Sequence, residues 1–153
     1  MAYRIALLLP LVAVLTLPAR SNHIIGAEIT WDCLGNNQYQ VTFNLFRDCF
    51  GITPGVQETI SIDSPCDSLD VIVTNVNIVE VSQLCPDDIV NSTCNGGTLP
   101  GIEQWIYTAN VTLPPCDQWT MSWSACCRST FFVNIGGGPL YVESALNNVV
   151  APC

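Results

Sequence analysis

Apolar and polar residues alternate along much of this chain with a period of two. From Gln38 to Phe46, the apolar residues Val41, Phe43 and Leu45 share one face of an extended chain, and polar residues occupy the other. Such alternation is typical of a β-strand with one buried face. Further candidate strands, which alternate or are rich in β-branched residues, are Ile24–Cys33, Glu58–Asp63, Asp70–Val81, Gln104–Leu113, Trp119–Ala125, Phe131–Ile135 and Leu140–Leu146.

Turn-forming residues separate the candidate strands, and no segment keeps the i, i+3, i+4 apolar spacing of a helix for three turns. The turn signals include Gly35-Asn36-Asn37 and Thr53-Pro54-Gly55, and the longest loop is expected at Ser82–Pro100, which has few apolar residues. About eight short strands with frequent turns predict an all-β fold, an antiparallel β-sandwich.

The segment 1–21 has the pattern of a secretory signal peptide. Its apolar run Ile5–Leu17 follows a single arginine and is too short for a membrane span, which needs about 20 apolar residues. The small residues Ala19 and Ser21 predict cleavage before Asn22, with cleavage after Ala19 as the alternative. We therefore expect a secreted protein whose remainder, 22–153, forms a single domain, without membrane insertion after signal cleavage.

Removal of this signal sharpens the charge balance. All thirteen acidic residues lie after it, whereas Arg47 and Arg128 are the basic residues that remain, so the net charge becomes −11. Such an acidic surface repels phosphate backbones, which argues against nucleic-acid binding. Anionic membrane surfaces are disfavoured for the same reason.

Nine cysteines in an exported chain predict a disulfide-stapled domain, because export leads to an oxidising compartment. They are Cys33, Cys49, Cys66, Cys85, Cys94, Cys116, Cys126, Cys127 and Cys153. The sequence does not choose among their many possible connectivities. Across its turn Cys33 faces Tyr39 and is not expected to pair with Cys49, whereas Cys85–Cys94 is the most plausible local bridge and would close the long loop.

Three further inferences come from the cysteines. Adjacent Cys126 and Cys127 would point to opposite faces of a strand, so we expect them to have different partners. The odd total and a chain that stops at Cys153 indicate the N-terminal fragment of a longer protein. A zinc site would need CxxC-type pairs or more histidines, and we therefore expect no metal.

Catalytic residues do not stand out. The lone histidine, His23, lies near the start of the mature chain, and no GxSxG or HExxH pattern occurs. Asp63, Asp67 and Asp70, or Asp87-Asp88, offer oxygen ligands that suit calcium, but EF-hand spacing is missing and a solvated acidic surface is the favoured interpretation. We predict that the protein is not an enzyme and has no cofactor, with calcium as a weak alternative.

The arginines and tryptophans each allow two interpretations. Arg47 and Arg128 both neighbour cysteines, which favours structural ion pairs with nearby carboxylates over ligand binding. Trp105, Trp119 and Trp123 occupy the apolar faces of their strands, which favours packing in the core. The alternative is that the tryptophans form a platform for stacking sugars.

An ordered set of stretches covers most of the mature chain. They are Asn22-His23-Ile24-Ile25-Gly26-Ala27-Glu28-Ile29, Cys33-Leu34-Gly35-Asn36-Asn37-Gln38-Tyr39, Leu45-Phe46-Arg47-Asp48-Cys49, Cys94-Asn95-Gly96-Gly97-Thr98, Tyr107–Pro115, Ala125-Cys126-Cys127-Arg128 and Leu146–Cys153. Together they resemble the N-terminal module of large Bacteroidetes cell-surface proteins, many of them gliding-motility-associated or adhesin-like. The chain departs mildly from that pattern at Asn22, commonly serine, and at Ala27, commonly glycine.

The resemblance implies a module that follows the signal peptide and precedes repeated sandwich domains and a sorting domain. We therefore expect a non-catalytic N-terminal structural or interaction module of an exported, adhesin-like bacterial cell-surface protein, linked to gliding motility or surface attachment. Its expected partners are the downstream domains of the same polypeptide and an extracellular polysaccharide or surface protein. The alternative function is a carbohydrate-binding module on a secreted protein.

Overall fold

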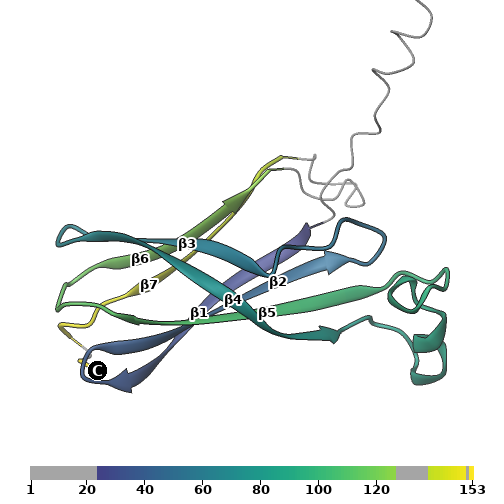
Figure 1. The fold of residues 1–153 in the computed structure, drawn as a ribbon, viewed down its shortest axis with the longest axis horizontal. Helices are drawn as coiled ribbons and strands as arrows, with labels where there is room; N and C mark the ends of the chain where they lie inside the picture. Colours follow the sequence, from purple (N-terminus) through teal and green to yellow (C-terminus); the bar gives the residue numbers. More distant parts are fainter. Residues whose placement is uncertain (1–23, 127–137, 151) are drawn as a thin grey trace, which may run out of the picture.

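The computed structural model describes residues 24–126, 138–150 and 152–153, and within them it is almost entirely antiparallel β-structure (Figure 1). The elements are β1 (Ile24–Gly35), β2 (Gln38–Asp48), β3 (Gln57–Asp63), β4 (Ser68–Glu80), the short 3-10 helices η1 (Pro86–Asn91) and η2 (Thr93–Asn95), β5 (Ile102–Thr112), β6 (Trp119–Ala125) and β7 (Leu140–Leu146). The predicted all-β class is confirmed, and seven of the candidate strands are present. The remaining candidate, Phe131–Ile135, lies outside the described residues.

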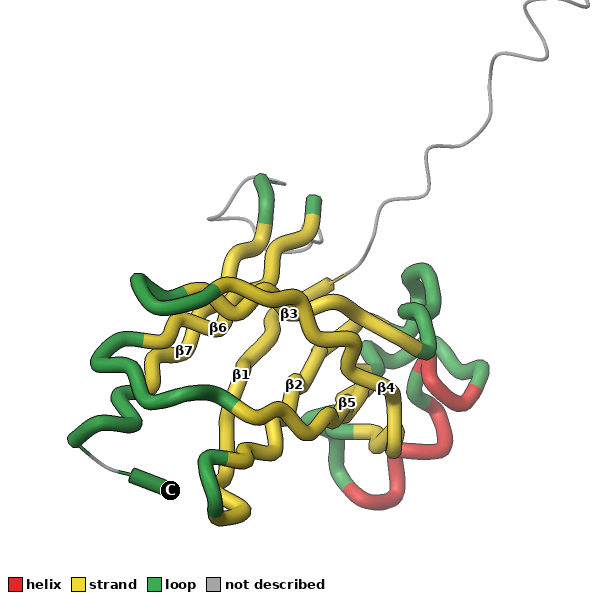
Figure 2. The backbone as a smooth tube through the Cα atoms, turned by 60° about the vertical axis from the view of Figure 1, so that its left-hand side comes forward, coloured by secondary structure: helices red, strands yellow, loops and turns green. Residues whose placement is uncertain are grey.

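The strands form one sheet in the order β1-β2-β5-β4-β3-β6-β7, which bends into two layers. Strand β4 makes the bend, because its first half pairs with β3 up to Thr74 and its second half pairs with β5 from Thr74 onward. A register shift between Asn75 and Asn77 marks the place where it changes partner. Figures 1 and 2 show β1, β2 and β5 in one layer and β3, β6 and β7 in the other.

The two ends of the strand order approach each other, so the sandwich is nearly a closed barrel. Strands β1 and β7 lie side by side (Figure 2). The indole N–H of Trp31 donates a hydrogen bond to the carbonyl oxygen of Ala145 at 3.3 Å. A side chain therefore bridges a seam that no backbone ladder closes among the described residues.

The core lies between the two layers and follows the period-two pattern. Strand β2 buries Tyr39, Val41, Phe43 and Leu45 and leaves the residues between them less buried. The exposed fractions of Trp105, Trp119 and Trp123 are 6%, 0% and 7%. The prediction that these three tryptophans pack in the core is confirmed.

The turn between β1 and β2 uses residues that tolerate left-handed backbone. Gly35, Asn36 and Asn37 have φ values of 96°, 53° and 60°. Asparagine enters this region more readily than other residues with a side chain, and glycine does so freely. This turn brings Cys33 opposite Tyr39, as the sequence predicts.

Three disulfides join described residues: Cys33–Cys153, Cys49–Cys94 and Cys66–Cys116. Their sequence separations are 120, 45 and 50 residues, so each one links distant parts of the chain. Cys126 is also disulfide-bonded. The prediction for Cys127 falls outside the described residues.

The predicted local bridge Cys85–Cys94 is wrong. Cys94 is bonded to Cys49, and Cys85 is an exposed free cysteine. The cause is the long pairing of β2 with β5, which carries the end of β2 to the end of the long loop, where the Cys49 N–H donates to the Gly101 carbonyl at 3.0 Å. A Cβ on Gly101 would lie only 2.6 Å from the Cys94 sulfur, so glycine permits this approach.

Candidate functional site

Arg47 lies on the inward face at the end of β2, where it forms an ion pair with Glu103 of β5. Its Nε donates to Glu103 Oε2 at 2.8 Å, and the two side chains are 10% and 19% exposed. The register of the sheet places these residues directly opposite each other. The other predicted ion-pair residue, Arg128, lies outside the described residues.

The same carboxylate also accepts a hydrogen bond from the Trp105 indole N–H at 3.0 Å, and the Arg47 guanidinium stands 6.0 Å from the centre of the Trp105 ring. Arg47 Nη1 further donates to the Gly51 carbonyl at 3.0 Å. Each charge therefore has partners within the protein. This arrangement fits the structural role predicted for Arg47, because it neutralises a half-buried carboxylate and ties down the loop after β2.

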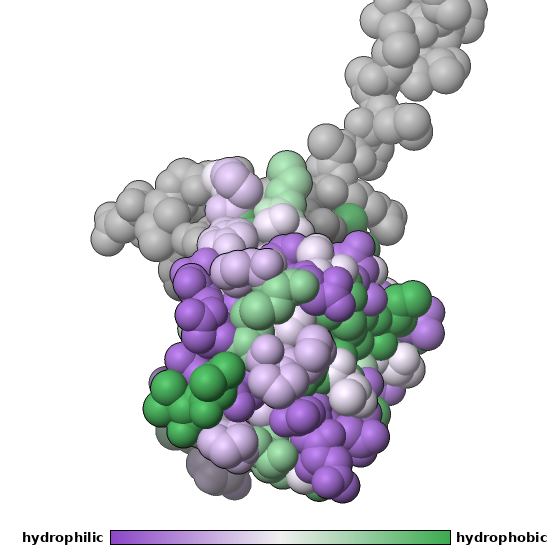
Figure 3. Space-filling view, turned by 90° about the vertical axis from the view of Figure 1, so that its left-hand side faces the viewer, coloured by the Kyte–Doolittle hydropathy of each residue, from purple (hydrophilic) through white to green (hydrophobic). Residues whose placement is uncertain are grey.

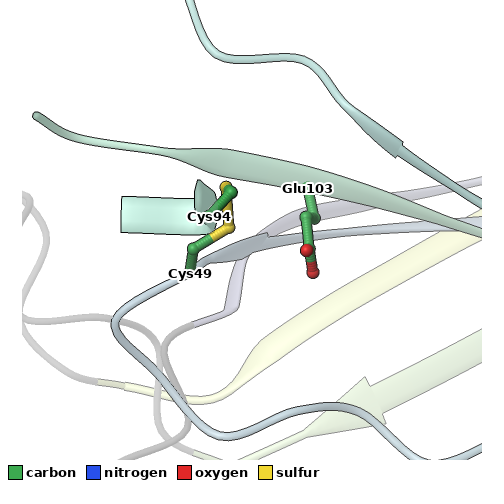
Figure 4. A group of neighbouring side chains, drawn as sticks. All are labelled: Cys49, Cys94 and Glu103. Carbon is green, nitrogen blue, oxygen red and sulfur yellow. A yellow bond between two sulfur atoms is a disulfide. The ribbon is translucent and has the colours of Figure 1, made fainter. Parts of the chain in front are cut away.

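Cys49, Cys94 and Glu103 form a group whose potential ligand atoms all lie within 4.8 Å of one another (Figure 4). Such a cluster resembles a thiolate metal site in its spacing. The two sulfur atoms are, however, bonded to each other, and a metal needs deprotonated thiolates. In its oxidised form this group is a covalent link between the β2–β3 loop and η2.

Asp63, Asp67, Asp70, Asp87 and Asp88, the candidates for the weaker calcium alternative, do not form a converging group of ligand atoms among the described residues. Asp63 and Asp70 are exposed on the β3–β4 hairpin, where each carboxylate accepts a hydrogen bond from a serine hydroxyl of the opposite strand, at 2.6 and 2.8 Å. Asp87 and Asp88 are exposed in the first turn of η1. These contacts stabilise the hairpin and leave the carboxylates in solvent.

A pocket of about 230 Å³ opens at the end of the sandwich where β2 and β6 finish and β3 begins. Its lining residues are Ile24, Leu45, Ile52, Thr53, Pro54, Gly55, Glu58, Trp123, Ser124 and Ala125. The β2–β3 loop forms one wall, the end of β6 forms another, and Ile24 of β1 and Leu45 of β2 complete the lining. We call this site the end pocket.

The loop wall of the end pocket is held at several points. Its beginning is fixed by the Cys49–Cys94 disulfide and by the hydrogen bond from Arg47 to Gly51. Farther along, the buried Tyr107 hydroxyl donates to the Gly55 carbonyl at 2.8 Å. The Asn75 N–H donates to the Val56 carbonyl at 2.9 Å. The pocket therefore exists as a preformed feature of the fold.

Glu58 is the one acidic group in the wall of the end pocket. It lies on the same face of β3 as the fully buried Ile60 and Ile62, so the strand directs this carboxylate inward. Its Oε2 accepts a hydrogen bond from the Trp123 indole N–H at 3.2 Å. Burial, and secondly the negative charge of Glu58, raise the pKa of the neighbouring Tyr107 hydroxyl.

Sequence reasoning did not single out Glu58, Glu103 or the pocket. A signal for Glu58 was present, because Glu58, Ile60 and Ile62 occupy alternate positions and an acid at a core-facing position is unusual. No local pattern marks Glu103 as the partner of Arg47, because 56 residues separate the two.

The opposite end of the molecule has a different character. Figure 3 shows hydrophobic residues there in separate clusters among hydrophilic ones. In the part of the chain that the structure describes, no helix has the length and apolar character to cross a membrane.

Comparisons with protein-family models, with curated proteins and with solved structures find no match to this chain.

Proposed function

We propose that this chain is a non-catalytic structural and interaction module of an exported cell-surface protein, adhesin-like and linked to surface attachment or gliding motility. The observation that carries the proposal is the set of three long-range disulfides across an all-β sandwich. Such bonds form and persist in oxidising compartments outside the cytosol. They also resist unfolding where chaperones are absent, because they restrict the unfolded chain.

The surface of β4 supports an interaction role. Ile72, Val76, Ile78 and Val79 are between 40% and 61% exposed. Apolar side chains gathered on one strand are a kind of surface that protein partners cover. An excess of acidic over basic residues in the same chain favours partners that carry positive charge.

The burial of the tryptophans counts against the carbohydrate-binding alternative. A sugar platform needs aromatic rings that solvent can reach, whereas Trp105, Trp119 and Trp123 are at most 7% exposed. Trp31 is partly buried against the core and bridges to β7. Their packing identifies them as scaffold residues in this fold.

The proposal can be tested on intact cells. Antibodies raised against the purified, oxidised domain should label unpermeabilised cells of the source organism, and deletion of the gene should reduce attachment to a solid surface. Antibodies against a cytoplasmic protein serve as the control. Labelling only after permeabilisation would contradict export, and unchanged attachment would contradict the adhesive role. Retention of the purified domain on a polysaccharide panel would instead favour a carbohydrate-binding module.

A further inference from the structure

We propose that the end pocket binds a primary alkylammonium group, presented as a lysine side chain by a partner polypeptide. The inference concerns a binding site and its ligand chemistry, and it does not depend on attachment to a cell surface. It follows from the size of the pocket, the position of Glu58 and the distribution of charge in the described chain.

The size of the end pocket suits one side chain. Its volume of about 230 Å³ falls below the roughly 300 to 1,000 Å³ of pockets that hold whole small molecules. Ile24, Leu45, Ile52 and Pro54 provide aliphatic walls. A four-carbon stem can bury apolar surface against such walls while its charged end reaches a polar group.

The charged group in the pocket is the carboxylate of Glu58, which is partly buried and accepts the hydrogen bond of the Trp123 indole. A carboxylate turned toward the core costs free energy unless a positive charge or several hydrogen bonds compensate it. Glu58 accepts one hydrogen bond, from Trp123. Arg47 is the only basic side chain in the described part of the chain, and it is paired with Glu103. An external cation would therefore supply the charge that Glu58 lacks among these residues.

Trp123 orients the carboxylate and adds a second recognition element. Its ring packs against Phe43 with the ring centres 4.9 Å apart, which fixes the indole in place. The indole N–H engages Glu58 Oε2 and leaves Oε1 for a ligand. An ammonium group also gains from an aromatic wall through cation–π attraction.

The geometry favours lysine over arginine. A guanidinium binds best to both oxygens of a carboxylate in a fork, whereas an ammonium is a compact point charge that one oxygen can receive. In the end pocket one of the two oxygens already accepts the Trp123 N–H. The net charge of −9 on the full chain would in addition attract a basic segment.

The test follows the Trp123 indole N–H signal in two-dimensional ¹H–¹⁵N NMR spectra of the intact oxidised protein. Nα-acetyl-L-lysine methylamide is the ligand probe, and the norleucine analogue, which has a similar stem without the charge, is its matched control. We expect a saturable shift with the lysine probe and at least a tenfold weaker response to norleucine. The arginine analogue should bind more weakly than lysine.

Three variants separate the effect of the charge from that of the cavity. Glu58→Gln keeps an oxygen that can accept the Trp123 N–H and removes the charge, so lysine binding should weaken about tenfold. Glu143→Gln makes the same charge change on the exposed face of β7 and should leave binding unchanged. Ile52→Trp should fill the pocket and abolish lysine binding. This variant provides an independent test if Glu58→Gln alters the fold.

Each contrary result overturns the proposal. Absence of a lysine-induced shift, an equal response to norleucine, or unchanged binding in Glu58→Gln would exclude recognition of an ammonium by Glu58. A shift with n-butylammonium but none with the lysine probe would identify a free amine as the ligand and would exclude a partner lysine.

Discussion

Trp119 shows how a single side chain stabilises this fold. It is fully buried between the layers, and its indole N–H donates to the Pro114 carbonyl at 3.2 Å. The residue therefore removes a large apolar surface from water and also satisfies its polar atom. It holds the start of β6 to the preceding proline-rich turn.

The replacement Trp119→Ala should lower the free energy of unfolding by about 3 to 5 kcal/mol, because it deletes buried atoms and leaves a cavity. Urea denaturation followed by circular dichroism measures this loss. Val150→Ala, at a position 81% exposed, should change stability by less than about 0.5 kcal/mol. A Trp119→Ala protein as stable as the wild type would refute its role in the core.

The acidic residues show that one residue type serves different purposes at different positions. The charge of Glu103 is balanced by Arg47, and its carboxylate also accepts a hydrogen bond from Trp105. Asp63 accepts a hydrogen bond from a serine hydroxyl in a solvated hairpin. Glu58 faces inward beside a pocket with a single hydrogen bond. Only the surroundings of each carboxylate distinguish a structural acid from a candidate binding group.

At the scale of elements, a side chain from another strand helps to hold the β2–β3 loop in place. Tyr107 of β5 is buried beneath it and donates to the Gly55 carbonyl. The pKa of this hydroxyl is raised, chiefly by burial and secondly by Glu58. The native protein therefore keeps Tyr107 neutral at an alkaline pH at which an unfolded tyrosine ionises, above about pH 10.

This shift predicts that stability decreases as the pH rises above about 10, because the unfolded state then releases a proton that the native state retains. The Tyr107 contribution is fully present below that pH. Tyr107→Phe should cost about 1 kcal/mol at pH 8 through the lost hydrogen bond. It should also weaken the loss of stability between about pH 10 and 11.

The measurement is urea denaturation at a series of pH values. A Cys85→Ser background prevents the free thiol from attacking disulfides at high pH. The comparison is between the Cys85→Ser protein with Tyr107 and the same protein with Tyr107→Phe. If their free energies of unfolding depended identically on pH, Tyr107 would ionise in the native state as readily as in the unfolded state.

The molecule as a whole is held together by links between distant positions. The Cys33–Cys153 bond spans 120 residues and ties the last residue to the β1–β2 hairpin. The backbone supports it, because the Asn37 N–H donates to the Cys153 carbonyl at 3.2 Å. Loss of this link would free a long loop in the unfolded state.

The double variant Cys33→Ala, Cys153→Ala should lose about 4 to 5 kcal/mol of stability, the chain-entropy estimate for a loop of this length. Cys85→Ser is the matched control and should unfold like the wild type, because Cys85 is exposed and unbonded. Thermal and urea denaturation under non-reducing conditions provide the comparison. If the double variant were as stable as Cys85→Ser, the Cys33–Cys153 disulfide would not stabilise the fold.

Much of the strand content was determined by the sequence alone. Residues such as Val41, Phe43 and Leu45 alternate locally, and local alternation decides which face of a strand is buried wherever a sheet forms. The same reasoning placed Trp105, Trp119 and Trp123 in the core. It also predicted correctly that Cys33 does not pair with Cys49, because a hairpin register is set by its own turn.

Only the tertiary structure decided which distant residues meet. The pairing of β2 with β5 brings Cys49 to Cys94 and Arg47 to Glu103, and the packing of β3 beside β6 brings Glu58 to Trp123. The most plausible local bridge, Cys85–Cys94, was wrong for this reason. Residues that lie 45 to 65 positions apart meet only if the order of the strands brings them together. A period-two pattern does not encode that order, because every alternating strand presents the same kind of hydrogen-bonding edge to its neighbours.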